Sequence, residues 1–185
     1  MGQLIAGIVL WWGAHLFKRL APGLRARMGP AGKALIALVL IGAVVLMVKG
    51  FKAADPVPVH TPLPGMGHLN NLLMLLAFYL LNMGYTKPLM ARRIRHPMLS
   101  AVVVWAVAHL IVNGDLASVV LFGSMLLWAL VEMAVINRAE GPWLNRPKGS
   151  ARGEVINIAL ALALFGAVAW YHAYSGHNPF LGTYP

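Results

Sequence analysis

The sequence predicts an all-α integral membrane protein, a polytopic bundle of about six transmembrane helices, from its composition, its apolar runs and the distribution of its charges. Of the 185 residues, 59% are hydrophobic and only 11% are charged, and the mean hydropathy is +0.72. So little polar sequence cannot cover a water-soluble globule of this size. We therefore expect the lipid bilayer to be a partner of the chain.

Six apolar runs are each close to the roughly 20 residues that a helix needs to cross about 30 Å of hydrocarbon. Their apolar residues are continuous rather than alternating, so they predict helices and not the strands of a membrane barrel. No linker separates a second domain, and we expect residues 1–185 to form a single domain. The predicted helices cover residues 3–19, 34–51, 69–86, 97–113, 116–137 and 154–174.

The basic residues predict the orientation of the bundle, because Lys and Arg accumulate in cytoplasmic loops. Thirteen of the 15 basic residues follow the first, third and fifth predicted helices, whereas Lys49 and Lys52 follow the second. We therefore predict that both termini lie outside. The net charge of +10 is divided among short loops with no recognition fold between them, so it does not predict nucleic-acid binding.

Two histidines lie inside predicted helices and share a local pattern. His15 follows Trp11 by four residues, and His109 follows Trp105 by four, with small residues between that would let a flat macrocycle approach the helix. A buried imidazole costs free energy unless it is hydrogen-bonded or coordinated. The pattern fits a porphyrin site, and it also fits interfacial tryptophans with small residues and one hydrogen bond between helices.

Five short motifs along the chain are RHPM (95–98), WAVAH (105–109), NGD (113–115), GAH (13–15) and GMGH (65–68). With these motifs the sequence resembles the NnrU-like membrane proteins, a family that includes the plant and cyanobacterial ζ-carotene isomerase. The resemblance covers nearly the whole chain. It implies a multi-pass protein of the bacterial inner (cytoplasmic) membrane.

The resemblance also implies a cofactor. The isomerase relatives bind haem b and isomerise a polyene double bond, while the bacterial branch is associated with denitrification and with nitric oxide and nitrite metabolism. Carried over by position, the haem iron ligands fall on His15 and His109. The protein would then serve nitrogen-oxide respiration beside a reductase subunit. The alternative is a haem-dependent isomerase or redox enzyme acting on a hydrophobic small molecule, a polyene such as ζ-carotene, so enzyme activity stays open.

Two features of the chain oppose a simple transfer from the isomerase. The plant enzymes have a cysteine three residues before the second histidine, whereas this chain has Ala106 and no cysteine at all, so a switch between histidine and thiolate ligation is absent. The predicted topology also places His15 near the inner surface and His109 near the outer one. The difference in depth is more than about 10 Å, which one iron does not easily bridge.

Other histidines are alternative ligands on grounds of depth. His68 and His172 lie toward the outer side with His109, whereas His96 lies on the inner side with His15. His68 and His96 are the replacements that we would test, as iron ligands, proton-transfer groups or donors that orient a ligand. Basic residues next to His96 would neutralise haem propionates, Arg92 and Arg95 among them.

The Arg95-His96-Pro97 motif also resembles membrane methyltransferases that modify isoprenylcysteine or phospholipid. Their acidic, tyrosine-containing C-terminal signature is missing, since the chain reads AEGPWLNRPKG after Arg138. Three interpretations concern other polar residues. We expect Glu132 to pair with a basic residue near the inner surface, Asp115 to cap the fifth predicted helix, and intramembrane asparagines such as Asn70 to bond between helices or to line a cavity.

Overall fold

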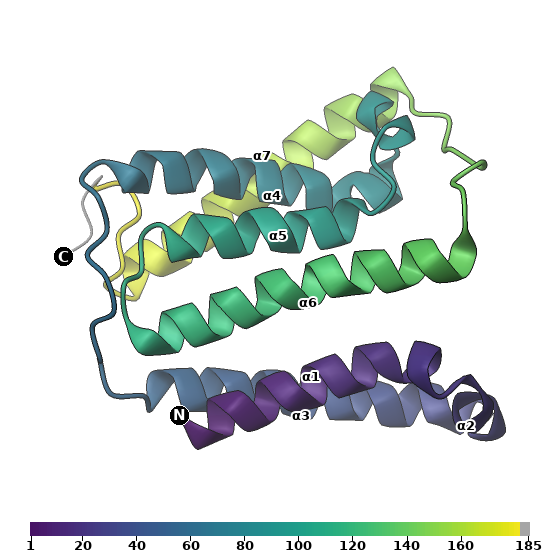
Figure 1. Ribbon diagram of the computed structural model, residues 1–185. Helices are drawn as coiled ribbons and strands as arrows, with labels where there is room; N and C mark the ends of the chain where they lie inside the picture. Colours follow the sequence, from purple (N-terminus) through teal and green to yellow (C-terminus); the bar gives the residue numbers. More distant parts are fainter. Residues whose placement is uncertain (182–185) are drawn as a thin grey trace.

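The computed structural model describes residues 1–181, and in this part of the chain all regular secondary structure is helical. Figure 1 shows the arrangement. The elements are α1 (Gly2–Leu20), α2 (Pro22–Arg27), α3 (Ala31–Lys52), α4 (Met66–Thr86), the 3₁₀ helix η1 (Leu89–Arg92), α5 (Pro97–Leu110), α6 (Leu116–Glu140) and α7 (Ala151–Tyr174). The predicted all-α class is confirmed.

The long helices run alternately up and down the bundle (Figure 1). An antiparallel pair, α1 and α3, lies along one side, and α6 separates this pair from α5. Helix α4 packs on α5, and α7 packs on α4 from the far side of the view. Helix α6 therefore contacts both α1 and α5, the helices that carry His15 and His109.

Three helices, α3, α6 and α7, are long and apolar enough to cross a membrane. Helices α1 and α4 have 19 and 21 residues but are not among these three candidates. Helix α5 has only 14 residues, about 21 Å of rise, which is shorter than the hydrocarbon layer of about 30 Å. The helices are thus compatible with a membrane, while the count of six spans and the outward orientation of both termini stay predictions.

The predicted helix over 97–113 is too long, because α5 ends at Leu110. Asn113 turns the chain: both its backbone N–H and its side-chain amide donate to the carbonyl of His109, at 3.0 and 2.8 Å. Gly114 then packs against the backbone of His60, where a Cβ atom would collide. The loop after α3 accordingly crosses the α5–α6 turn, with Leu116 N–H donating to Val57 O at 2.8 Å.

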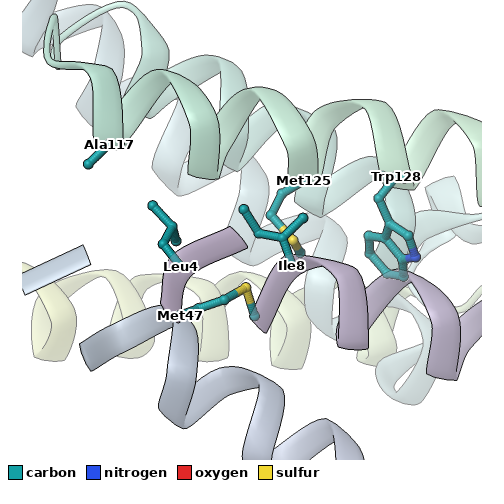
Figure 2. Packing of buried hydrophobic residues seen from close by; sticks show 7 residues of the cluster. Leu4, Ile8, Met47, Ala117, Met125 and Trp128 are labelled. Atoms are coloured by element: carbon teal, nitrogen blue, oxygen red, sulfur yellow. The ribbon is translucent and has the colours of Figure 1, made fainter. Parts of the chain in front are cut away.

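The main core lies between α1, α3 and α6 (Figure 2). Leu4 is fully buried there, next to Ile8 of the same helix and Met47 of α3, and α6 adds Met125 and Trp128. Helices α1 and α3 come close because Gly50 has no side chain, and a Cβ atom at this position would meet the backbone of Leu4. This core fixes the face that α6 presents to α1.

One end of the bundle collects most of the positive charge. The α1–α3, α4–α5 and α6–α7 connections all lie at this end (Figure 1), and the thirteen basic residues noted in the sequence lie in these connections or in the adjoining turns of the helices. The guanidinium of Arg19 is 2.7 Å from Glu140, an ion pair that joins α1 to the end of α6. We call this end the basic end. It is the one that the sequence predicts to be cytoplasmic.

Candidate functional site

His15 lies on the face of α1 that meets α6. Its Nδ1 is 3.0 Å from the carbonyl oxygen of Trp11. Because a carbonyl can only accept, Nδ1 carries the proton, and the lone pair of Nε2 in the neutral ring is free to bind a ligand. The imidazole ring centroid is 4.3 Å from that of Trp11 and 4.7 Å from that of Trp128 on α6.

Buried polar atoms without a partner lie on α1 and α6, the two helices that meet at His15. Within the described residues, the indole nitrogens of Trp11, Trp12 and Trp128 and the Oε2 atom of Glu132 are buried and make no hydrogen bond. Glu132 follows Trp128 by one helical turn, so the two share a face of α6. Buried polar groups are normally paired, since leaving one unpaired costs on the order of 1–3 kcal/mol. This cluster therefore has the chemistry of a binding site.

The expectation for Glu132 was wrong. We expected a basic partner, but no ion pair to Glu132 occurs in the described part of the chain, and Arg19, the nearby cation, pairs with Glu140 instead. Asp115 does cap α6, because its Oδ1 accepts the N–H of Ser118 at 2.9 Å.

His109 is the penultimate residue of α5 and also meets α6. Its Nδ1 is 2.9 Å from the carbonyl oxygen of Trp105, so its Nε2 is likewise the free nitrogen. The imidazole stacks on Phe122 of α6, with centroids 4.5 Å apart and planes inclined by 25°. Trp105 contacts the same phenylalanine edge-on at 5.0 Å. Asn70 of α4 supports this segment by donating to Ala108 O at 2.7 Å.

The two histidines contact α6 at different levels. His109 packs on Phe122 and His15 on Trp128, and these positions are six residues apart, about 9 Å along the helix axis. The imidazoles are thus offset along α6 in the direction that the sequence predicts, by about 9 Å rather than by more than about 10 Å. In this arrangement the two imidazoles belong to separate aromatic clusters.

A third imidazole has the same local geometry. The Nδ1 atom of His172 on α7 is 2.8 Å from Val168 O, which leaves its Nε2 free. His172 is also close enough to His109 for their charges to interact.

The remaining predicted site residues are engaged elsewhere or exposed. His96 Nε2 is 2.8 Å from Asn137 Oδ1, and Arg95 donates to Gly141 O at 2.7 Å, so the RHP motif ties the start of α5 to the end of α6. His68 is exposed near the start of α4. Arg92 lines a cavity at the basic end that neither His15 nor His96 lines.

Sequence reasoning found the histidines and their tryptophans but missed the residues of α6. Phe122 completes the cluster of His109 and Trp128 that of His15, and Glu132, one turn from Trp128, has a buried Oε2 without a described partner. Helix α6 is apolar on nearly all sides, so its sequence does not indicate which face meets α1 and which meets α5. Only the polar Glu132 within an apolar run gave a signal.

Fold and site together define a class: an α-helical bundle with membrane-compatible helices and with buried, unpaired polar atoms on α1 and α6 among the described residues. A family described as NnrU protein matches residues 3–179. The chain therefore belongs to the NnrU family, as the motifs predicted. Neither the curated proteins nor the solved structures contain a match to this chain.

Proposed function

We propose that this NnrU-family protein binds haem b in the inner membrane of a bacterium and serves nitric oxide and nitrite metabolism, with His15 and His109 as candidate iron ligands. The observation that carries the proposal is the shared geometry of the two imidazoles. Each has its Nδ1 proton fixed on a carbonyl oxygen, at 3.0 and 2.9 Å, and no described residue hydrogen-bonds the Nε2 of either ring. Haem-ligating histidines need this tautomer.

The donors fit a haem iron, and the surroundings of His15 add to the fit. On α1 and α6, the helices that meet at His15, three indole N–H groups and Oε2 of Glu132 are buried without a hydrogen-bond partner among the described residues. Bound haem would supply a redox-active iron that binds nitric oxide. The protein's own residues would hold the imidazoles in one tautomer and keep water from the site by aromatic packing.

The offset between His15 and His109 along α6 raises the question of whether both bind the same iron. For both to bind one iron, the offset of about 9 Å between their contact levels on α6 would have to shrink. Without such a change, the second ligand of His109 is another residue, and His172 on α7, whose Nδ1 is also held by a carbonyl oxygen, is the first to test. His68 and His96 follow, although His96 would first have to leave Asn137.

The test is the ratio of haem to protein after purification in detergent from haem-replete cells. We expect wild type to retain haem and His109→Ala to lose it. Loss in His15→Ala as well assigns the second ligand to His15, and loss in His172→Ala assigns it to His172. His177→Ala is the matched control, because His177 is exposed in the tail and should leave the ratio unchanged. Haem-free wild-type protein, or full retention in His109→Ala, would contradict the proposal.

A further inference from the structure

A second feature of the molecule lies apart from the histidines, in a cavity of about 470 Å³ at the basic end. Four cationic side chains line it, namely Arg92, Arg93, Arg146 and Lys148. They come from two connections that are distant in sequence: the first two follow α4, and the others precede α7. Both connections lie at the same end of the bundle (Figure 1).

Backbone contacts hold the two connections together. The N–H of Ser150 donates to Lys87 O at 3.1 Å, and the N–H of Leu89 donates to Glu154 Oε2 at 2.8 Å. Gly149 packs directly on Pro88, where a Cβ atom would collide with the backbone. These contacts fix the two connections, and the four cations that they carry, relative to each other.

The cavity has no counter-charge of its own. No carboxylate lines it, and no ion pair to any of the four cations occurs among residues 1–181. The nearby Glu154 is already occupied, because one oxygen accepts from Tyr79 and the other from Leu89. Glu140 pairs with Arg19 and Arg95. Like charges that share a cavity repel each other, and a bound anion would offset this repulsion.

The side chains also indicate the kind of anion. Three of the four are arginines, and a guanidinium forms paired, planar hydrogen bonds to the oxygens of a phosphate. Arg146 is steadied by Trp143, whose ring centroid is 5.4 Å from its guanidinium carbon. A second cavity at this end, about 600 Å³ in volume, is also basic, but two of its cations are engaged, Arg19 with Glu140 and Arg25 with Gly29 O.

We propose that the cavity formed by Arg92, Arg93, Arg146 and Lys148 binds a phosphate group. The phosphate comes from an anionic lipid headgroup or from a soluble phosphate, since both present the same oxygens to the guanidinium groups. Basic pockets at the cytoplasmic side of membrane helices suit such headgroups. The site is independent of the histidines, so it stands or falls separately from haem binding.

The test compares two double variants with the same loss of charge. Arg93→Gln/Arg146→Gln removes two guanidinium groups from the cavity, and Arg27→Gln/Arg138→Gln removes two from the same end but outside both cavities. Each purified protein is titrated with inorganic phosphate by equilibrium dialysis. Each is also reconstituted with phosphatidylglycerol or phosphatidylethanolamine, and native mass spectrometry counts the retained lipids.

We expect wild type to bind phosphatidylglycerol, inorganic phosphate or both, and the cavity variant to bind about tenfold more weakly or worse. The control should stay within about twofold of wild type. Binding of the lipid alone assigns a headgroup, and binding of inorganic phosphate alone assigns a soluble anion. If wild type binds neither, or if the control loses as much as the cavity variant, the proposal is wrong. Should the double variant misfold by circular dichroism, the single variant Lys148→Gln replaces it with the same criteria.

Discussion

The imidazole of His109 stacks on the phenyl ring of Phe122, with centroids 4.5 Å apart and an inclination of 25°. This contact joins the end of α5 to α6 and limits the rotation of the imidazole, which the Trp105 carbonyl already holds through Nδ1. The free Nε2 thus has a fixed direction. The histidine is part of the packing as well as a candidate ligand, so the two roles must be tested separately.

Phe122→Ala should lower stability and expose His109. Phe122 is 6% exposed, and truncation of a buried phenylalanine costs about 3–5 kcal/mol in soluble cores. We expect a lower midpoint of thermal unfolding and faster carbethoxylation of His109, read by mass spectrometry. Phe165→Ala is the control, because this ring contacts only Phe180 among the described aromatic side chains. Equal effects of the two substitutions would mean that the stacking of Phe122 on His109 neither stabilises the protein nor shields His109 more than an ordinary aromatic contact does.

Gly50→Ala should push α1 and α3 apart. The added Cβ would meet the backbone of Leu4, which cannot rotate away as a side chain could, and overpacking of this kind costs about 1–3 kcal/mol. Gly42→Ala on the same helix has open space around it and should gain about 0.5–1 kcal/mol from helix propensity. Thermal unfolding in detergent should show opposite shifts. A stabilised Gly50→Ala protein would contradict the close packing of these helices.

Asn70→Ala should weaken the contact between α4 and α5 beside His109. Asn70 is 6% exposed, and its amide donates to Ala108 O at 2.7 Å. Hydrogen bonds between membrane helices contribute about 1 kcal/mol. Asn82→Ala serves as control, since its amide bonds only to Phe78 O within its own helix. Unfolding by guanidinium or by denaturing detergent should show a lower stability for Asn70→Ala than for Asn82→Ala. Indistinguishable unfolding curves would mean that the Asn70 hydrogen bond does not stabilise the contact between α4 and α5.

The cap of α6 predicts a dependence on pH. Burial alone would raise the pKa of Asp115, but hydrogen bonds from the hydroxyl and N–H of Ser118 outweigh it, and the pKa is lowered below its ordinary value. A carboxyl whose pKa is lower in the folded state stabilises fully above its unfolded pKa of about 4 and loses this contribution as the pH falls through the folded value.

Thermal unfolding of wild type and Asp115→Asn between about pH 7 and about pH 3 checks this expectation. Asparagine also caps helices but does not titrate in this range. The difference in stability between wild type and variant should be largest at the upper end and should shrink on acidification. A difference that is constant across the range would show that the charge of Asp115 contributes nothing.

Much of the helical framework was predictable, because long apolar runs have few alternatives in lipid. The short helices α2 and η1 were missed, since they lie in basic loops with no apolar period. The end of α5 was misplaced because Ile111 and Val112 are as apolar as the residues before them. The turn there depends on Asn113 bonding to His109 and on a loop that passes Gly114, and neither contact is visible in the sequence.

The candidate site was predictable only in part. His15 and His109 were found because an imidazole in an apolar run is costly and because a tryptophan precedes each by one turn. Phe122 and Trp128 could not be assigned to them, since any residue of an apolar helix could face either neighbour. The charged cavity was hidden for another reason: Arg92 and Arg146 are far apart in sequence and meet only in the fold.

The central claim is that this NnrU-family protein holds a haem iron at His109. A reduced-minus-oxidised absorption spectrum of the purified wild-type protein tests it most directly, because the measurement needs no knowledge of a substrate or partner. We predict a Soret band that shifts on reduction with dithionite, and its loss in His109→Ala. A colourless wild-type protein from haem-replete cells, with a flat difference spectrum, would contradict the claim.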